Sequence, residues 1–416
     1  MNTTTRVVIT GMGAVTPIGN SVDAYWQNLL VGKSGAVPIS KFDASLFKTQ
    51  FACELQGFSI DNYLDKKDAR KLDPFVHYAI ASTDEAIAQA GLTPTAINYN
   101  KVGVIWASGN GGITTFEEQM MEYAAGDGTP RFNPFFIPRI LVDIAAGHIS
   151  MRHGFRGVNY CPVSACASAN TAIIDAANYI KLGYANVIIA GGSEAPITRA
   201  AIGGFGAMKA LSTNNENYVS ASRPFDATRD GFVMGEGAGA LVLENYDHAI
   251  ARGATILAEV CGGGMSADAY HLTATHPQGL GARLAMEQAC EIAHINKTEI
   301  NYINMHATST PVGDLSELMA VTTFMGDSIN TINIGATKSM TGHLLGASGA
   351  IEAVACVKAI MHGAIPPTVH VTQLDATINA TLNLTLNVAQ HKTINYAMSN
   401  NFGFGGHNAS VLFGKL

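Results

Sequence analysis

Cys166 lies in a segment of small residues that could present a nucleophile. The segment Val163-Ser-Ala-Cys-Ala-Ser-Ala-Asn170 joins an extended run to an apolar helix. Small neighbours let a substrate and a tight turn approach the sulfur, and a thiol at a helix N-terminus has its thiolate stabilised by the helix dipole. Alternatively, Cys166 is a small buried side chain of the core. Its local context alone supports the two interpretations equally.

Two histidines occupy loops of small residues beside strand-like runs. His306 belongs to Asn304-Met-His-Ala-Thr-Ser-Thr310, and His343 belongs to Lys338-Ser-Met-Thr-Gly-His-Leu-Leu-Gly346. Open α/β sheets place their ligand sites at strand ends. One such histidine is more often a satisfied structural residue. Two of them, with Cys166 at a matching position, favour an active centre.

Two cofactor interpretations are weaker. Cys166, His306 and His343 are acceptable zinc ligands, but none has the i, i+3 or i, i+4 partner of common zinc motifs. Gly11-Met-Gly13 resembles the start of a dinucleotide fold, but Thr16 takes the third glycine position. We therefore expect no metal and no cofactor, and we predict a turn at these glycines.

Short β-branched runs alternate with longer helical patterns, which is typical of an α/β fold with mainly parallel strands. The clearest predicted strands are Arg6–Thr10, Val102–Trp106, Val187–Ala190, Ala240–Glu244, Ile332–Ile334 and Tyr396–Ser399. Glycine turns are expected after three of them, at 11–13, 191–192 and 403–406. The predicted helices are Asp73–Gln89, Asn170–Leu182, Ala282–Ala293 and Gly349–His362, the second and fourth ending at Gly183 and Gly363.

Composition and length favour a large globular protein. The chain has 416 residues, 47% of them hydrophobic and 14% charged, which suits two domains or two halves around one core. A second strand-then-glycine run at Thr255–Gly264 echoes the start of the chain. It predicts a weak internal repeat, with halves at residues 1–254 and 255–416.

Charge and cysteine usage exclude several classes. The net charge of −7 argues against a general nucleic-acid binder, and six scattered cysteines form no disulfide framework. The polar segment Met1–Thr5 leads straight into a strand-like run, so we expect no signal peptide. No apolar run reaches the ~20 residues of a membrane helix without interruption. These features predict a reduced, cytoplasmic protein.

Taken together, Cys166, His306, His343, the run Lys338–His343 and the run Asn401–Gly406 resemble the β-ketoacyl-[acyl-carrier-protein] synthase family. The similarity extends from Val8 to Phe413 and is closest to the elongating type II enzyme, through Arg223-Pro-Phe-Asp226, Arg229-Asp-Gly-Phe232 and Gly235-Glu-Gly-Ala-Gly239. The resemblance implies the thiolase fold, five αβαβα layers built from two related halves, usually in a dimer.

The resemblance also implies a decarboxylative condensation with assigned roles. Cys166 would take an acyl chain from acyl carrier protein, with the backbone N–H groups of Cys166 and Phe404 as oxyanion hole. Neutral His306 and His343 would stabilise the enolate left when a malonyl thioester loses carbon dioxide. Lys338 and Glu352 would hold the charge and hydrogen-bond pattern of the site.

The remaining implied residues bind substrate. Phe404, between glycines that permit movement, would gate the second substrate. Thr308 and Thr310 would line the phosphopantetheine path, and Phe402 and Asn110 would line the substrate pocket.

Four residues depart from the family pattern. Ala307 replaces a usual glycine, Asn401 a usual serine and His407 a common threonine, and these changes should be tolerated. Asn110 stands where long-chain enzymes carry an apolar residue at the floor of the acyl pocket. Its amide either pairs inside a shorter or wetter pocket, which we favour, or turns towards a dimer interface.

An acidic carrier protein needs a basic docking face. Lys66, Lys67, Arg70 and Lys71 form a basic cluster, with Lys209 elsewhere, although acidic neighbours make a solvated helix start an equal alternative. We expect a homodimer, with a heterodimer with a related subunit possible. The competing functions are a ketosynthase of a specialised polyene or polyketide pathway, possibly with a chain-length-factor partner, and a non-catalytic scaffold.

Overall fold

The computed structural model describes residues 5–93, 95 and 97–416. In this part of the chain, ten strands pair in the order β10-β9-β13-β14-β8-β1-β7-β6-β4-β5. Their bounds are β1 (Val7–Val15), β4 (Val102–Ala107), β5 (Asn159–Tyr160), β6 (Val187–Glu194), β7 (Gly237–Asn245), β8 (Ala258–Ala267), β9 (Tyr302–Asn304), β10 (Asn333–Gly335), β13 (Tyr396–Gly403) and β14 (His407–Gly414). The prediction of mainly parallel strands is wrong, because β1, β7, β8 and β14 pair antiparallel with all their neighbours.

The strand pattern repeats on either side of β1 and β8. On one side, β1–β7 and β7–β6 are antiparallel pairs, and β6–β4 and β4–β5 are parallel pairs. On the other side, β8–β14 and β14–β13 are antiparallel, and β13–β9 and β9–β10 are parallel. Among the residues that the structure describes, the strand pairing between the two sets joins Val8 to Glu259 and Ile9 to Ala258. The run at Thr255–Gly264 thus leads into β8, the counterpart of β1. A boundary at residue 254 stays a prediction.

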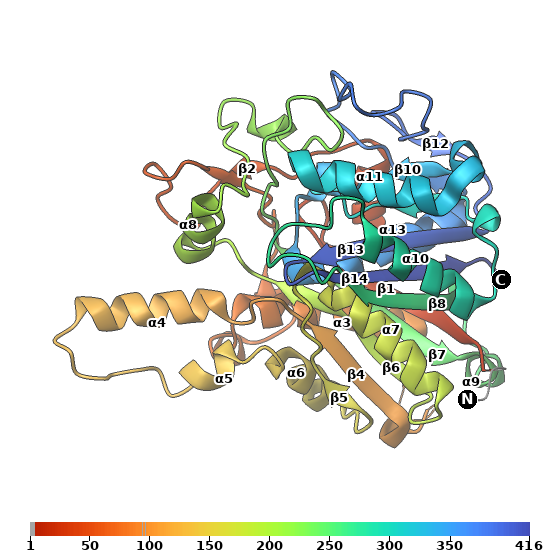
Figure 1. Cartoon of the computed structure of the whole chain (residues 1–416). Helices are drawn as coiled ribbons and strands as arrows, with labels where there is room; N and C mark the ends of the chain where they lie inside the picture. The colour runs from red at the N-terminus through yellow and green to blue at the C-terminus, as the bar shows by residue number, and fades with distance from the viewer. Residues whose placement is uncertain (1–4, 94, 96) are drawn as a thin grey trace.

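Helices form three layers around the two sets of strands (Figure 1). α3 (Pro74–Ala90) packs on β1 and β7, and α10 (Leu280–Ala293) packs on β8 and β14. α7 (Ser168–Lys181) and α13 (Ser348–His362) contact strands of both sets and lie between them. This is the five-layered αβαβα arrangement of the thiolase fold, as predicted.

The glycines near the start of the chain lie inside β1, so the predicted turn is wrong. A Cβ at Gly13 would lie 1.8 Å from the carbonyl oxygen of Ser82, and one at Gly11 would lie 2.1 Å from that of Ala86, both in α3. Gly262 and Gly264 play the same part in β8 against α10. These glycines let a helix pack directly on a strand, which explains the repeated signal. Gly191 and Gly192 also lie within a strand, β6.

The other predicted elements match the structure closely. All four predicted helices are present, and Gly183 (φ 78°) and Gly363 (φ 59°) take the left-handed conformation at their ends. The turn between β13 and β14 uses Gly405 and Gly406 at positive φ. The remaining elements are α1 (Val22–Leu30), α2 (Lys66–Ala69), α4 (Ile113–Ala125), α5 (Phe136–Ile140), α6 (Ile144–His153), α8 (Arg199–Ala207), α9 (Tyr246–Ala251), α11 (Pro311–Met325), α12 (Lys338–Thr341), β2 (Val37–Pro38), β3 (Phe51–Ala52), β11 (Ala364–Ile365) and β12 (Gln390–His391).

One long apolar helical segment belongs to the core. Leu345–His362 is long and apolar enough to cross a membrane, but 89% of it is buried inside the protein. This segment contains α13, one of the two helices that lie between the two sets of strands. The six cysteines are unpaired, and Met1–Thr4 lie outside the described residues.

Candidate active site

Cys166 lies in a tight turn, Ala165–Ala167, immediately before α7. Ala165 has φ +50°, and the turn packs against Gly403 at the end of β13. A Cβ at Gly403 would lie 2.6 Å from the carbonyl oxygen of Ser164 and 2.9 Å from the Cys166 nitrogen. Small residues in both segments of the chain therefore let the β13–β14 turn approach the sulfur.

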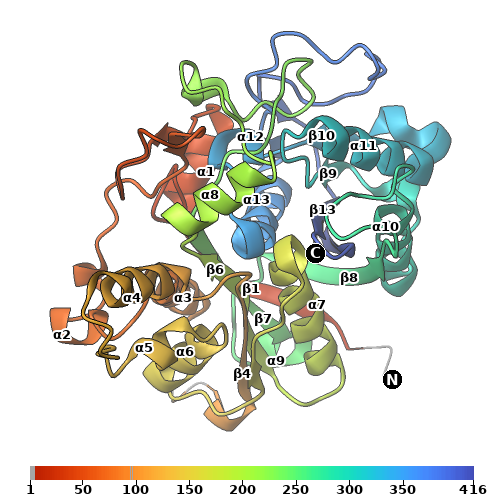
Figure 2. The same cartoon turned by 60° about the vertical axis from the view of Figure 1, so that its left-hand side comes forward.

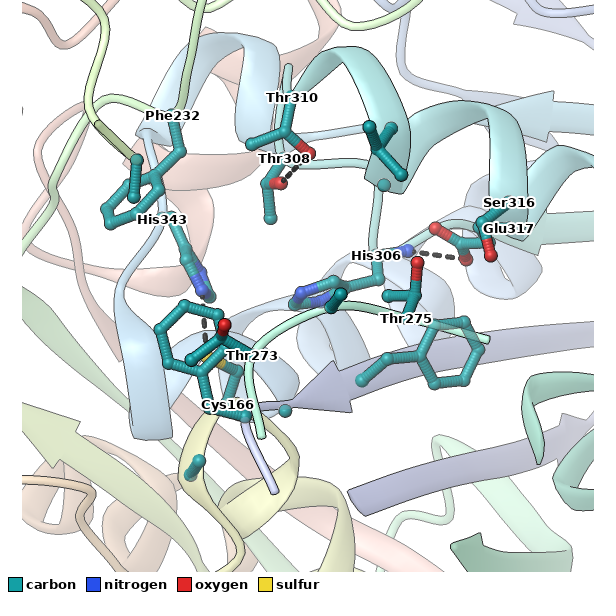
Figure 3. A pocket seen from close by; sticks show the side chains of 18 of the residues that line it. Cys166, Phe232, Thr273, Thr275, His306, Thr308, Thr310, Ser316, Glu317 and His343 are labelled. Atoms are coloured by element: carbon teal, nitrogen blue, oxygen red, sulfur yellow. Dashed lines mark hydrogen bonds between the residues drawn. The ribbon is translucent and has the colours of Figure 1, made fainter. Parts of the chain in front are cut away.

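The structure brings Cys166, His306 and His343 together from three separate loops (Figure 3). His343 Nε2 lies 3.0 Å from the Cys166 sulfur. The two imidazole rings are 5.1 Å apart between centroids and nearly perpendicular, at 85°. The potential ligand atoms of the three residues all lie within 4.8 Å of one another. A substrate carbonyl between them could meet both histidines and the sulfur.

Burial favours the uncharged form of all three groups. It raises the pKa of the Cys166 thiol to about 12, although the Lys338 charge and the N–H groups of Phe404 and Cys166 lower it. The expected helix-stabilised thiolate is therefore overridden by burial. Burial and the Lys338 charge hold the pKa of both His306 and His343 well below the ordinary 6.5. The thiol consequently needs a base, and His343 is in contact with it.

Lys338 and Glu352 form a buried ion pair behind the histidines. Lys338 Nζ donates to Glu352 Oε1, and both side chains are 1% exposed. Asn401 Nδ2 donates to Glu352 Oε2 at 2.8 Å and lies 3.3 Å from His306 Nδ1. Burial raises the pKa of Glu352, whereas Lys338 and Asn401 lower it. The pair places a positive charge near the histidines, which keeps them neutral.

Glu317, on α11, was missed by sequence reasoning. Its carboxylate accepts the backbone N–H groups of His306 at 2.8 Å and Ala307 at 2.7 Å, which fixes the loop that carries the histidine. Burial raises the pKa of Glu317 to about 8. The available signal was an acidic residue at 3% exposure in an apolar helix that directly follows the loop. The departure at Ala307 therefore keeps its backbone hydrogen bond to Glu317.

A cavity of about 530 Å³ opens onto the three reactive groups. Its wall is mostly apolar. Thr308 and Thr310 line it, with their hydroxyl oxygens 3.2 Å apart. Phe402 also lines it, with its ring 5.9 Å from that of His306, and Phe404 lies on the turn after β13, 36% exposed. Lys338 and Glu352 lie behind this wall.

Asn110 lines the cavity and binds a buried carboxylate. Its Nδ2 donates to Glu194 Oε2 at 3.1 Å, and its backbone N–H donates to Glu194 Oε1 at 3.0 Å. Ser108 Oγ and the N–H groups of Gly109 and Gly346 also donate to Glu194. The Asn110 amide is therefore paired with the buried Glu194 carboxylate.

The predicted docking residues occupy two places. Lys209 is exposed and lines the cavity. Lys66, Lys67, Arg70 and Lys71 lie on and just after α2, outside the cavity wall, and Lys71 pairs with Asp68. Figure 2 shows α2 well separated from α8, which ends shortly before Lys209.

The same three groups could hold a transition metal. One sulfur and two imidazole nitrogens within 4.8 Å suit a soft divalent ion. Such an ion would have to replace the hydrogen bond between Cys166 and His343. On sequence grounds a metal was disfavoured because these residues lack the short spacing of common zinc motifs, and the structure shows that they lie on different loops.

Comparison with known proteins identifies relatives along the whole chain. The family "Beta-ketoacyl synthase, N-terminal domain" matches residues 4–249, and "Beta-ketoacyl synthase, C-terminal domain" matches residues 257–372. The 3-oxoacyl-[acyl-carrier-protein] synthase 2 of Staphylococcus aureus (strain COL) is 44% identical, with both chains covered completely. The enzyme of the same name from Synechocystis sp. is 42% identical over 99% of this chain and 98% of its own.

Solved structures agree with the fold. A beta-ketoacyl synthase from Burkholderia phymatum superposes with a TM-score of 0.91 at 34% identity, covering 99% of this chain and 100% of its own. The ishigamide ketosynthase/chain length factor superposes with a TM-score of 0.92 at 32% identity, covering 99% of both chains.

Proposed function

The chain belongs to the β-ketoacyl synthase family and is a condensing acyltransferase of fatty-acid elongation, and we propose that Cys166, His306 and His343 divide its reaction between them. The reaction joins an enzyme-bound acyl group to a malonyl thioester with loss of carbon dioxide. The observation that carries the assignment is the 3.0 Å contact between His343 and the Cys166 sulfur, at the inner wall of the cavity.

Acyl transfer comes first. Cys166 gives its proton to His343 Nε2, and the sulfur attacks the thioester carbonyl of the acyl carrier protein. The bond to the carrier sulfur breaks, and His343 returns the proton to that sulfur. The N–H groups of Cys166 and Phe404, which lower the pKa of the thiol, would bind the developing oxyanion.

Decarboxylation follows on the second substrate. The bond between the malonyl α-carbon and its carboxylate breaks, and its electron pair forms the enolate of the thioester. His306 and His343 would donate to the enolate oxygen. Neutral imidazoles serve this purpose, and their lowered pKa values keep them neutral.

Condensation then forms the new carbon–carbon bond. The enolate carbon attacks the carbonyl carbon of the Cys166 thioester. The oxygen of that carbonyl becomes an oxyanion and enters the oxyanion hole formed by the two N–H groups. Collapse expels the Cys166 sulfur as a thiolate and releases the β-ketoacyl carrier thioester, and the thiolate takes up one proton from solvent through His343. The Lys338–Glu352 pair supplies the fixed charge behind the histidines.

Substitution of the nucleophile tests this division of labour. Cys166→Gln should abolish condensation but keep malonyl decarboxylation, since both histidines remain. Cys161→Ala, five residues away, is a matched control and should retain condensation. Loss of decarboxylation in Cys166→Gln, with a normal melting curve, would contradict the proposed roles.

Acyl carrier protein is the proposed partner. Structure neighbours include a type II ketosynthase in complex with its acyl-carrier protein, 30% identical over 99% of this chain at a TM-score of 0.90. Lys209 lies at the cavity, where a tethered substrate must enter. Lys66, Lys67, Arg70 and Lys71 would act as a second basic contact. Charge reversal at Lys209 should raise KM for the carrier substrate more than that for a small thioester.

A homodimer is also proposed, and a heterodimer with a related subunit remains the alternative. α4, α5 and the chain between them project from the body (Figure 1). This projecting segment exposes large apolar side chains, with exposed fractions from 36% to 57%: Phe116, Met121, Tyr123, Phe132, Phe135 and Ile137. Light scattering on the purified chain tests for twice the mass of 43.7 kDa. Cytoplasmic location and halves at 1–254 and 255–416 stay proposals.

A ketosynthase of a specialised polyene or polyketide pathway is the second candidate. Asn110, a polar residue in the acyl cavity, favours it, as does the similarity to the ishigamide ketosynthase/chain length factor. Carrier-bound acyl chains of several lengths and degrees of unsaturation separate the two candidates. A preference for saturated chains supports ordinary fatty-acid elongation.

A further inference from the structure

Asn401 occupies the space between His306 and the Lys338–Glu352 ion pair. It lies on β13 and is fully buried. Its Nδ2 contacts Glu352 Oε2 at 2.8 Å and His306 Nδ1 at 3.3 Å. One amide nitrogen thus lies between the buried carboxylate and a ring nitrogen of the histidine.

The orientation of this amide is set by Glu352. An ionised carboxylate can only accept hydrogen bonds, so the group facing Oε2 must be the NH₂. The reverse orientation would place the Asn401 oxygen against the carboxylate and forfeit the hydrogen bond. The oxygen instead faces the first turn of α13, where a Cβ at Gly349 would come within 2.5 Å of it. That glycine leaves the room the amide needs.

The consequence for His306 is a fixed tautomer. Because the second amide hydrogen faces Nδ1, this ring nitrogen accepts and carries no proton. The proton of the neutral ring is then on Nε2, the nitrogen away from Asn401. Burial and the Lys338 charge keep the ring from gaining a second proton. His306 is therefore held as a donor.

His343 has no such constraint. Its Nδ1 lies 2.9 Å from the hydroxyl oxygen of Ser348, which can donate or accept. Its Nε2 can therefore accept from the Cys166 thiol in one tautomer and donate in the other. The two histidines differ in the partner behind each ring, a hydroxyl for one and an amide for the other.

We propose that Asn401 is a positioning residue that holds His306 in its Nε2–H tautomer, the form that donates to the enolate. The proposal rests on the decarboxylation role given to His306 above. A hydroxyl at this position would not fix the tautomer, because it can donate or accept. The amide makes His306 of this chain a dedicated donor.

Nitrogen NMR on histidine-labelled protein tests the proposal directly. The chain has 13 histidines, so the His306 signals are assigned by their loss in His306→Gln. We expect an unprotonated Nδ1 and a protonated Nε2 in the wild type, and a mixture of tautomers in Asn401→Leu and Asn401→Ser. A protonated Nδ1 in the wild type, or an unchanged single tautomer in both variants, overturns the proposal.

Rates give the second readout. In the Cys166→Gln background, malonyl decarboxylation should fall about 10- to 100-fold in Asn401→Leu, as when a residue that orients a reactive histidine is removed. Asn401→Ser, which keeps a hydroxyl donor, should recover part of the loss. Acyl transfer to Cys166 should persist in the single variants. Equal loss of both steps indicates a merely structural role and overturns the proposal.

Failure of the proposed function would look different. If Cys166→Gln itself does not decarboxylate malonyl thioester, the role of His306 is wrong, whatever the Asn401 variants do. The tautomer measurement needs no activity. A wild type that decarboxylates, combined with Asn401 variants that match it in rate and tautomer, refutes only the role of Asn401.

Discussion

Replacing Asn110 by isoleucine should change both the stability of the acyl pocket and its chain-length preference. Glu194 Oε2 accepts from Asn110 Nδ2 at 3.1 Å and from the Gly346 N–H at 3.3 Å. Asn110→Ile leaves that oxygen with only the longer contact. An under-satisfied buried acceptor costs about 1–3 kcal/mol, so the unfolding free energy should fall by that amount.

The same change adds apolar surface to the cavity wall, where we propose that the acyl chain ends. Each methylene that gains an apolar contact contributes about 0.8 kcal/mol, or roughly a fourfold change in kcat/KM. The ratio of kcat/KM for long saturated chains to kcat/KM for short ones should therefore rise about fourfold for each methylene that contacts the new side chain. The assay compares carrier-bound saturated chains that differ by two carbons, with unsaturated chains alongside.

Asn110→Ala is the matched control for this experiment. It removes the same hydrogen bond to Glu194 but adds no methylene groups, so it should lose stability without favouring longer chains. An identical chain-length profile in the wild type and Asn110→Ile would refute the inference that Asn110 limits the pocket. Denaturant unfolding of all three proteins measures the stability part independently.

Four further outcomes are expected. His306→Ala and His343→Ala should each lower the rate of malonyl decarboxylation about 100- to 1,000-fold, because each removes one donor worth about 2.7–4 kcal/mol. Acyl transfer should survive in His306→Ala. A full decarboxylation rate in both variants would exclude the proposed roles. Glu317→Gln leaves one loop N–H without its carboxylate partner, so the free energy of unfolding should fall by about 1–3 kcal/mol and decarboxylation should slow. Unchanged values in denaturant unfolding and in the rate would show that the loop keeps its conformation without Glu317. Both histidines have a lowered pKa, so their neutral forms persist below pH 6.5 and are lost only as the pH falls further. The decarboxylation rate of Cys166→Gln should therefore stay level as the pH falls through 6.5. A histidine that titrates at or above pH 6.5 would contradict this. Chelators should leave condensation unchanged, and a loss restored by added zinc would favour the metal interpretation.

The three reactive groups could be predicted because each carries a local signal. Cys166 has small neighbours before a helix, and each histidine follows a strand in a loop of small residues. Their meeting at one point follows from the fold, since strand ends of related halves face a common site. Local sequence patterns of this kind can be recognised without any knowledge of long-range contacts.

The residues that orient these groups could not be predicted from local sequence. Glu317 and Asn401 act through contacts formed only when α11 and β13 pack beside the active site. Glu194 meets Asn110 across 84 positions of the chain. None of these contacts produces a periodic pattern or a short motif.

The wrongly predicted glycine turns have one physical source. Glycine at Gly11, Gly13 and Gly191 was interpreted as a turn, although each lies within a strand. A glycine that allows a neighbouring backbone to approach looks the same in sequence as one that adopts a positive φ. Only the partner in space, such as Ser82 of α3 against Gly13, distinguishes the two uses.

The central claim is that Cys166 carries the acyl group between the two half-reactions. Intact-protein mass spectrometry after a single turnover with acyl carrier thioester tests it most directly. We predict one added acyl mass, mapped by peptide analysis to Cys166, that disappears when malonyl carrier thioester is added and β-ketoacyl product forms. An adduct on another of the six cysteines, or product formation in Cys166→Ala, would contradict it.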